Sequence, residues 1–80
     1  MATKAQHSKS YQRIPPFLRA LRESAGLTQR QLGDRLEKPQ SWVHNCESAN
    51  RRVDVTDFIA WATACGEDPL AAFAQFLKSR

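Results

Sequence analysis

The fold of this chain is decided by one stretch, GLTQRQLGDRLEKPQSWVHNCES, which occupies residues 26–48. Thr28 is a good N-cap residue, and Gln31 stands three positions later, which is the spacing of a capping box. Leu32 and Leu36 lie one helical turn apart, so both face the same side. The stretch therefore begins with a short amphipathic helix that starts at Thr28.

A second short helix follows the first after a tight break. Pro39 excludes the residue before it from the α region, so the first helix has to end by about residue 37. The next helix begins near Gln40, and Val43 and Cys46, at i and i+3, form its inward pair. Gly33 lies where the two helices cross, and its lack of a Cβ allows a close approach. The pattern predicts two short helices joined by a sharp turn.

Three further helices are predicted outside this stretch, over residues 15–25, 54–65 and 69–77. The first opens on paired prolines, which a first helical turn tolerates, and the other two open on the N-caps Asp54 and Asp68. Each carries apolar residues at helical spacing, and no segment alternates polar and apolar residues as a half-buried strand does. We therefore expect an all-α fold, a compact domain of five short helices.

Charge is distributed unevenly along the chain. Residues 1–52 hold ten Lys and Arg against four Asp and Glu, whereas residues 53–80 hold two against four. A cationic half of this kind favours a polyanionic partner, nucleic acid before membrane. Residues 1–13 have too few apolar side chains to offset their ordering entropy, so we expect a flexible basic arm there and the folded domain over 14–80.

Composition narrows the function classes. The chain has 80 residues, enough for one small domain, and no apolar run approaches the ~20 residues of a membrane span. Cys46 and Cys65 match no metal or redox spacing and are expected to be reduced thiols. His44 and Cys46 stand at i and i+2, on different helix faces, so no metal site and no cofactor are expected. No catalytic constellation is recognisable either, so we do not expect an enzyme.

The outward face of the helix that begins near Gln40 carries neutral hydrogen-bonding side chains. Such side chains can read base edges in a DNA major groove, although a merely solvated face has the same composition. They are Gln40, Ser41, His44 and Asn45. Residues that can hold phosphates stand around them, namely Gln29, Arg30, Lys38, Arg51 and Arg52.

This ordered set of motifs resembles the Xre family of helix-turn-helix regulators, the phage repressor and Cro type with a lambda-repressor-like fold. The motifs are GLTQ at residues 26–29, Leu32, Gly33, QSWV at residues 40–43 with Glu47 after it, and GEDP at residues 66–69. Glu37 and Ala49 depart from the pattern, because the family usually has glycine at both positions. A positive φ would cost Ala49 about 1 kcal/mol.

The resemblance implies that the helix over residues 40–48 is the recognition helix. Gln29 would bond a phosphate and brace Gln40, and Trp42 would lie near the sugar-phosphate backbone, with plain packing as an equal alternative. Members of the family usually bind double-stranded DNA as homodimers on near-palindromic operators. We therefore expect a sequence-specific transcriptional regulator, a repressor, in the cytoplasm of a bacterium or encoded by a phage.

Homodimerisation needs a self-complementary apolar surface, and the last helix is the candidate because it is more apolar than so short a terminal helix needs. The candidate interface residues are Trp61, Leu70, Phe73, Phe76 and Leu77. If Leu70 or Phe73 packs inward, Phe76 is left, with Trp61, to meet the second copy; the alternative is that Phe76 closes the core of the monomer.

Two other function classes stay open. The domain could be a protein-interaction module or antitoxin component that docks a partner protein through its last helix. It could also be a thiol-dependent catalyst that uses Cys46, a weaker hypothesis because the family places that side chain inward. Salt-dependent binding to random duplex DNA tests the first class, and thiol labelling of the native protein tests the second.

Overall fold

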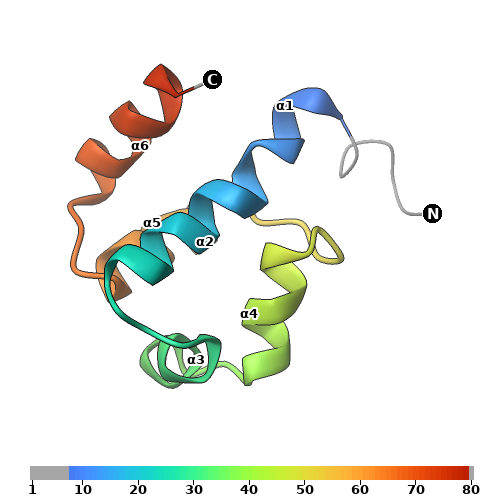
Figure 1. Ribbon diagram of the computed structural model, residues 1–80, viewed down its shortest axis with the longest axis vertical. Helices are drawn as coiled ribbons and strands as arrows, with labels where there is room; N and C mark the ends of the chain where they lie inside the picture. The colour runs from blue at the N-terminus through green and yellow to red at the C-terminus, as the bar shows by residue number, and fades with distance from the viewer. Residues whose placement is uncertain (1–7, 80) are drawn as a thin grey trace.

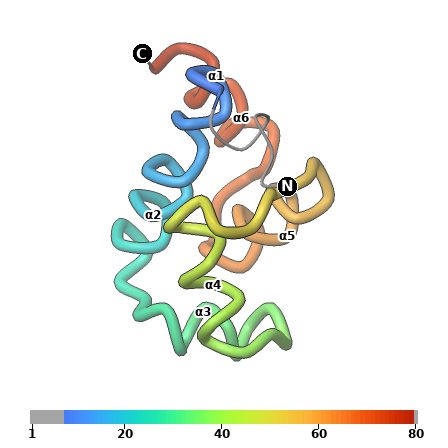
Figure 2. Tube along the Cα trace, turned by 90° about the vertical axis from the view of Figure 1, so that its right-hand side faces the viewer, coloured from blue at the N-terminus to red at the C-terminus, as the bar shows by residue number. Residues whose placement is uncertain are grey.

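The computed structural model describes residues 8–79, and all regular structure within them is helical. The elements are α1 (Lys9–Gln12), α2 (Ile14–Ser24), α3 (Gln29–Leu36), α4 (Gln40–Glu47), α5 (Val55–Ala64) and α6 (Pro69–Lys78). In Figure 1, α3 and α4 lie at one end of the molecule and α1 and α6 at the other, with α2 between them. Figure 2 shows the same arrangement after a quarter turn. The predicted all-α fold is confirmed, with the four-residue α1 added to the five expected helices.

Local chemistry sets the helix starts, as the sequence predicts. The Thr28 side chain accepts a hydrogen bond from the Gln31 N–H at 3.0 Å, and the Gln31 side chain accepts one from the Thr28 N–H at 2.9 Å. Asp54 forms the same reciprocal box with Asp57 at the start of α5, and Asp68 caps α6. These caps satisfy backbone N–H groups that a helix start leaves without partners.

The core is made by α2, α3, α4 and α5 around one fully buried tryptophan. Trp61 packs among Leu18, Leu32, Val43 and Cys46, all of which are fully buried. The Trp61 Nε1–H donates a hydrogen bond to the Leu18 carbonyl oxygen at 3.0 Å, so its polar edge is satisfied inside the core. The expectation that Trp61 meets a second copy is therefore corrected, because no part of this side chain reaches the surface.

The face that α6 buries also differs from the expectation. Phe76 is only 7% exposed and packs edge-on against Phe17, with ring centroids 5.2 Å apart. Leu70 and Phe73 are 76% and 47% exposed, and Leu77 is exposed as well. Phe76 therefore closes the monomer core, and the apolar residues that α6 presents outward are the other three.

The chain before α2 is folded from Ser8 onward. Tyr11, in α1, is buried, and the Arg13 guanidinium donates hydrogen bonds to the Phe76 and Ser79 carbonyl oxygens at the end of α6. The expected arm over residues 1–13 is thus wrong for residues 8–13, because two side chains supply contacts that composition alone does not reveal. Residues 1–7 lie outside the described part of the chain. Within that part, no helix is long and apolar enough to cross a membrane.

Candidate nucleic-acid interface

The turn between α3 and α4 brings the two helices close together. Glu37 ends α3 in the left-handed region with a φ of 59°, and the Lys38 N–H then donates to the Gly33 carbonyl oxygen at 2.9 Å. A Cβ on Gly33 would stand 2.7 Å from the Lys38 carbonyl oxygen. The close approach expected at Gly33 is confirmed, and its neighbour is the backbone of the turn. Ala49, after α4, has a φ of 65°, as its departure from the usual glycine anticipated.

The outer side of α4 presents the four side chains that the sequence singled out for base contact. Val43 and Cys46 are fully buried, which turns the opposite side of the helix outward. Gln40, Ser41 and His44 are exposed, and Asn45 is half-buried. Backbone N–H groups of residues 50 and 51 also donate to the Asn45 carbonyl oxygen, which closes the end of the helix. The four side chains together form a polar, neutral surface on the outer side of α4.

A polar network holds α4 against α2 and α3. The Gln40 amide donates to the Gln29 Oε1 at 3.4 Å, so the expected brace between these two residues is present. Gln29 in turn donates to Glu47 at 3.1 Å, and Arg22 donates to both Glu47 carboxylate oxygens at 2.6 and 3.0 Å. Arg22 also donates to the Leu27 carbonyl oxygen at 2.8 Å. The network fixes the position and the rotation of α4.

The Arg22–Glu47 ion pair is a feature that the sequence analysis missed. The two side chains are 10% and 5% exposed, and their hydrogen bond raises the pKa of Arg22 above its ordinary value. The partners are 25 residues apart and sit on different helices. Helical periodicity cannot predict a contact between two different helices. The presence of Glu47 in the family motif was the one signal in the sequence that pointed to this residue.

Aromatic rings hold cations at both ends of α4. The Lys38 Nζ lies 5.4 Å from the Trp42 ring centroid, and the Arg51 guanidinium lies 5.1 Å from the same ring. Arg52 lies 4.8 Å from the Tyr11 ring centroid. All three cations are exposed, as is Arg30 on α3. Trp42 also stacks at a tilt on the buried Trp61, with centroids 6.2 Å apart, so it combines core packing with a place beside the cations.

The buried cysteines offer no accessible nucleophile. Burial raises the pKa of both the Cys46 and the Cys65 thiol to about 11, so both are neutral at physiological pH. The thiolate is the reactive form of cysteine, and the thiol hypothesis therefore has no support at Cys46. Among residues 8–79, no three His, Cys, Asp or Glu side chains gather as metal ligands would.

Comparisons with known proteins agree with this geometry. A family model described as a helix-turn-helix domain matches residues 17–75, from α2 into α6. Among solved structures, the chain is similar to an XRE-family like protein from Pseudomonas syringae pv. tomato str. DC3000, with 39% sequence identity and a TM-score of 0.81. The alignment covers 95% of this chain and 93% of that one. A search of curated proteins found no match.

Proposed function

Because this chain belongs to the Xre family of helix-turn-helix DNA-binding proteins, we propose that it recognises a specific DNA site and represses transcription there as a homodimer. The single observation that carries the proposal is the outer side of α4, where four neutral hydrogen-bonding side chains are flanked at both ends of the helix by exposed cations. A surface of this kind suits a groove that offers base edges between two rows of phosphates.

Base recognition falls to α4. Its outer side chains can enter a major groove, where amide and hydroxyl groups pair with the donors and acceptors of the bases. Gln40 is at the first turn of the helix, where side chains reach furthest into the groove, and Gln29 holds its amide in place. We assign base contacts to Gln40, Ser41, His44 and Asn45.

Phosphate contacts fall to the residues around the helix. Lys38 precedes α4 and Arg51 and Arg52 follow it, so the cations bracket the bases on the two sides where a duplex presents its backbones. Gln29 and Arg30 lie at the start of α3, whose N-terminus also favours anions. Trp42 lies between two of these cations and contributes to the same contact. These contacts supply the salt-dependent part of the affinity.

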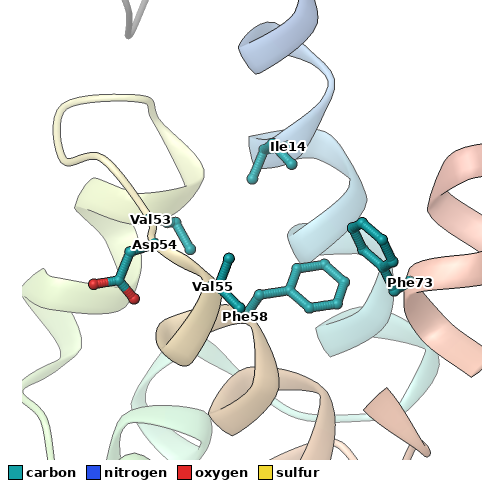
Figure 3. A pocket seen from close by; sticks show the side chains of 6 residues that line it. All are labelled: Ile14, Val53, Asp54, Val55, Phe58 and Phe73. Atoms are coloured by element: carbon teal, nitrogen blue, oxygen red, sulfur yellow. The ribbon is translucent and has the colours of Figure 1, made fainter. Parts of the chain in front are cut away.

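We assign dimerisation to an apolar groove between α5 and α6. This α5–α6 groove is lined by Val55, Phe58, Ile59, Pro69, Leu70 and Phe73. It continues past Phe58 and Phe73 toward Ile14 on α2, as Figure 3 shows. Exposed apolar residues that are contiguous mark interaction sites, and α6 lies at the opposite end of the molecule from α3 in both views of the chain. We favour a second copy of the chain as the occupant of this groove, because members of the family usually form homodimers.

The same groove supports a second candidate function. An apolar channel without polar lining also suits a helix of a different protein, as in an antitoxin component that docks its partner. The wild-type assembly state distinguishes the two occupants, because only the homodimer forms from the purified chain alone.

Selection of bound duplexes from a randomised library tests the DNA-binding proposal. We expect one preferred site, on which Gln40→Ala and Asn45→Ala each cost about 1–3 kcal/mol, with much smaller losses on random duplex. Gln75→Ala, on the exposed side of α6, is the matched control and should change neither affinity. Equal losses of affinity on both DNAs would show that Gln40 and Asn45 do not recognise sequence. If the selection enriches no duplex at all, the proposal of sequence-specific DNA binding is wrong.

A further inference from the structure

Tyr11 lies outside the proposed DNA-binding surface but contacts the segment that carries Arg51 and Arg52. Its side chain is buried, with 6% of its surface exposed, although α1 itself is only one turn long. The hydroxyl accepts a hydrogen bond from the Val53 N–H at 2.8 Å and donates one to the Arg51 carbonyl oxygen at 3.4 Å. These partners are 42 and 40 residues away, on either side of Arg52. The tyrosine therefore pins the backbone that carries both arginines.

The segment over residues 50–53 is held from two other directions as well. The Asn50 and Arg51 N–H groups donate to the Asn45 carbonyl oxygen at 2.9 and 3.1 Å, which ties the segment to the end of α4. The Arg52 guanidinium lies over the Tyr11 ring, and the Arg51 guanidinium lies over the Trp42 ring. Each arginine, although exposed as a residue, thus rests its guanidinium on an aromatic ring.

We propose that Tyr11 is a positioning residue for DNA binding, whose hydroxyl sets the path of the Arg51–Val53 backbone and so presents Arg51 and Arg52 to the phosphates beyond the end of α4. The inference rests on the proposed function and extends it to a residue outside the helix-turn-helix. An arginine already held in place loses less conformational entropy on binding than one on a mobile loop. Burial also raises the pKa of Tyr11, so the hydroxyl keeps its proton and can donate at neutral pH.

Tyr11→Phe is the sharpest test, because it removes both hydrogen bonds and keeps the ring that packs in the core and lies under Arg52. The probes are a duplex selected by the wild-type protein and a random-sequence duplex, titrated by fluorescence anisotropy over a series of salt concentrations. We expect a loss of affinity of about three- to tenfold on both duplexes. The slope of log K against log salt should become shallower by about 0.9 for each phosphate that the variant no longer neutralises.

The salt slope separates positioning from a merely structural role. Partial unfolding of the variant lowers the affinity by the same factor at each salt concentration and leaves the slope unchanged. Circular dichroism gives the folded fraction, and Ser10→Ala, an exposed change in the same short helix, is the matched control. In an Arg51→Gln, Arg52→Gln background, Tyr11→Phe should have no further effect on the slope.

Three results would overturn the role of Tyr11. The first is a folded Tyr11→Phe variant with wild-type affinity and slope, and the second is an undiminished effect when both arginines are already neutral. These leave the DNA-binding proposal standing, because the wild-type protein still binds. The third is a wild-type protein that binds neither duplex, which overturns both proposals together.

Discussion

Glu47 illustrates how much one residue can organise at the scale of single side chains. Its two carboxylate oxygens accept hydrogen bonds from Arg22 on α2 and from Gln29 on α3, while its own backbone belongs to α4. Through Gln29 the same network reaches Gln40, at the start of the surface proposed to contact bases. A single buried acidic residue thus connects the stability of the domain to the orientation of α4, the proposed recognition helix.

Glu47→Ala should lower the free energy of unfolding by about 3–5 kcal/mol, because it leaves the Arg22 guanidinium charged and unpaired in a buried position. Urea denaturation followed by circular dichroism measures this loss. Glu23→Ala is the matched control, since it breaks an exposed pair with Arg19 and should cost less than about 1 kcal/mol. Similar losses for the two variants would mean that the buried pair contributes no more than a surface pair does.

At the scale of elements, the unit that matters is the pair α3 and α4 with its turn. Backbone contacts shape its turn: the Lys38 N–H donates to the Gly33 carbonyl oxygen, and Glu37 adopts the left-handed conformation although it is not glycine. A non-glycine residue there costs on the order of 1 kcal/mol, which the packing of the two helices offsets. Gly33 has a different role: because it has no Cβ, the backbone of the turn can lie directly against α3.

Gly33→Ala separates helix propensity from this close approach. Propensity alone predicts a gain of about 1 kcal/mol, since alanine is the better helix former. The added Cβ would meet the Lys38 carbonyl oxygen at 2.7 Å, and a backbone atom cannot move away cheaply, so we expect a net loss of about 1–3 kcal/mol. Thermal unfolding gives the sign directly, and a higher melting temperature would show that the turn relaxes without cost.

At the scale of the whole molecule, the two ends of the domain differ in character. The α3–α4 turn lies at one end, and α6, which forms one wall of the α5–α6 groove, lies at the other, while the segment with Arg51 and Arg52 lies between them, against Trp42 and Tyr11 (Figures 1 and 2). Two copies joined through the groove can therefore associate without bringing their α3–α4 turns together. Arg13 and Tyr11 connect α6 with the segment after α4, since Arg13 binds the end of α6 while Tyr11, two residues earlier, binds that segment.

If the proposed homodimer forms at micromolar concentration, Leu70→Asp should convert it into a folded monomer that binds its selected DNA site more weakly. Leu70 is 76% exposed and lies in the first turn of α6, where an acidic side chain is compatible with the helix. Gln75→Glu adds the same charge to another exposed position of α6 and serves as the control. Sedimentation equilibrium measures the assembly state. A wild-type chain that is already monomeric at these concentrations would rule out a second copy as the occupant of the groove.

Much of the fold and of the candidate site could be predicted from the sequence, because the signals involved are local. Caps such as Thr28 with Gln31 act over three residues, and the inward pair Val43 and Cys46 is set by the period of one helix. Once α4 and its buried side are known, its outward side chains follow. Glu37 and Ala49, which both have a positive φ, were marked instead by the resemblance to the Xre family, which usually has glycine at these positions.

Only the tertiary structure shows which residues pack together when the partners are distant in the chain. Trp61 and Phe76 were expected at a dimer interface, but both complete the core of one copy. Tyr11 and Arg13 were assigned to a flexible arm, yet they contact residues 40 to 66 positions later. Helical periodicity identifies the apolar side of a helix. It does not identify which of the apolar residues on that side packs against another helix. That choice depends on how the helices pack, because burial is a property of the assembled fold and local propensity is not.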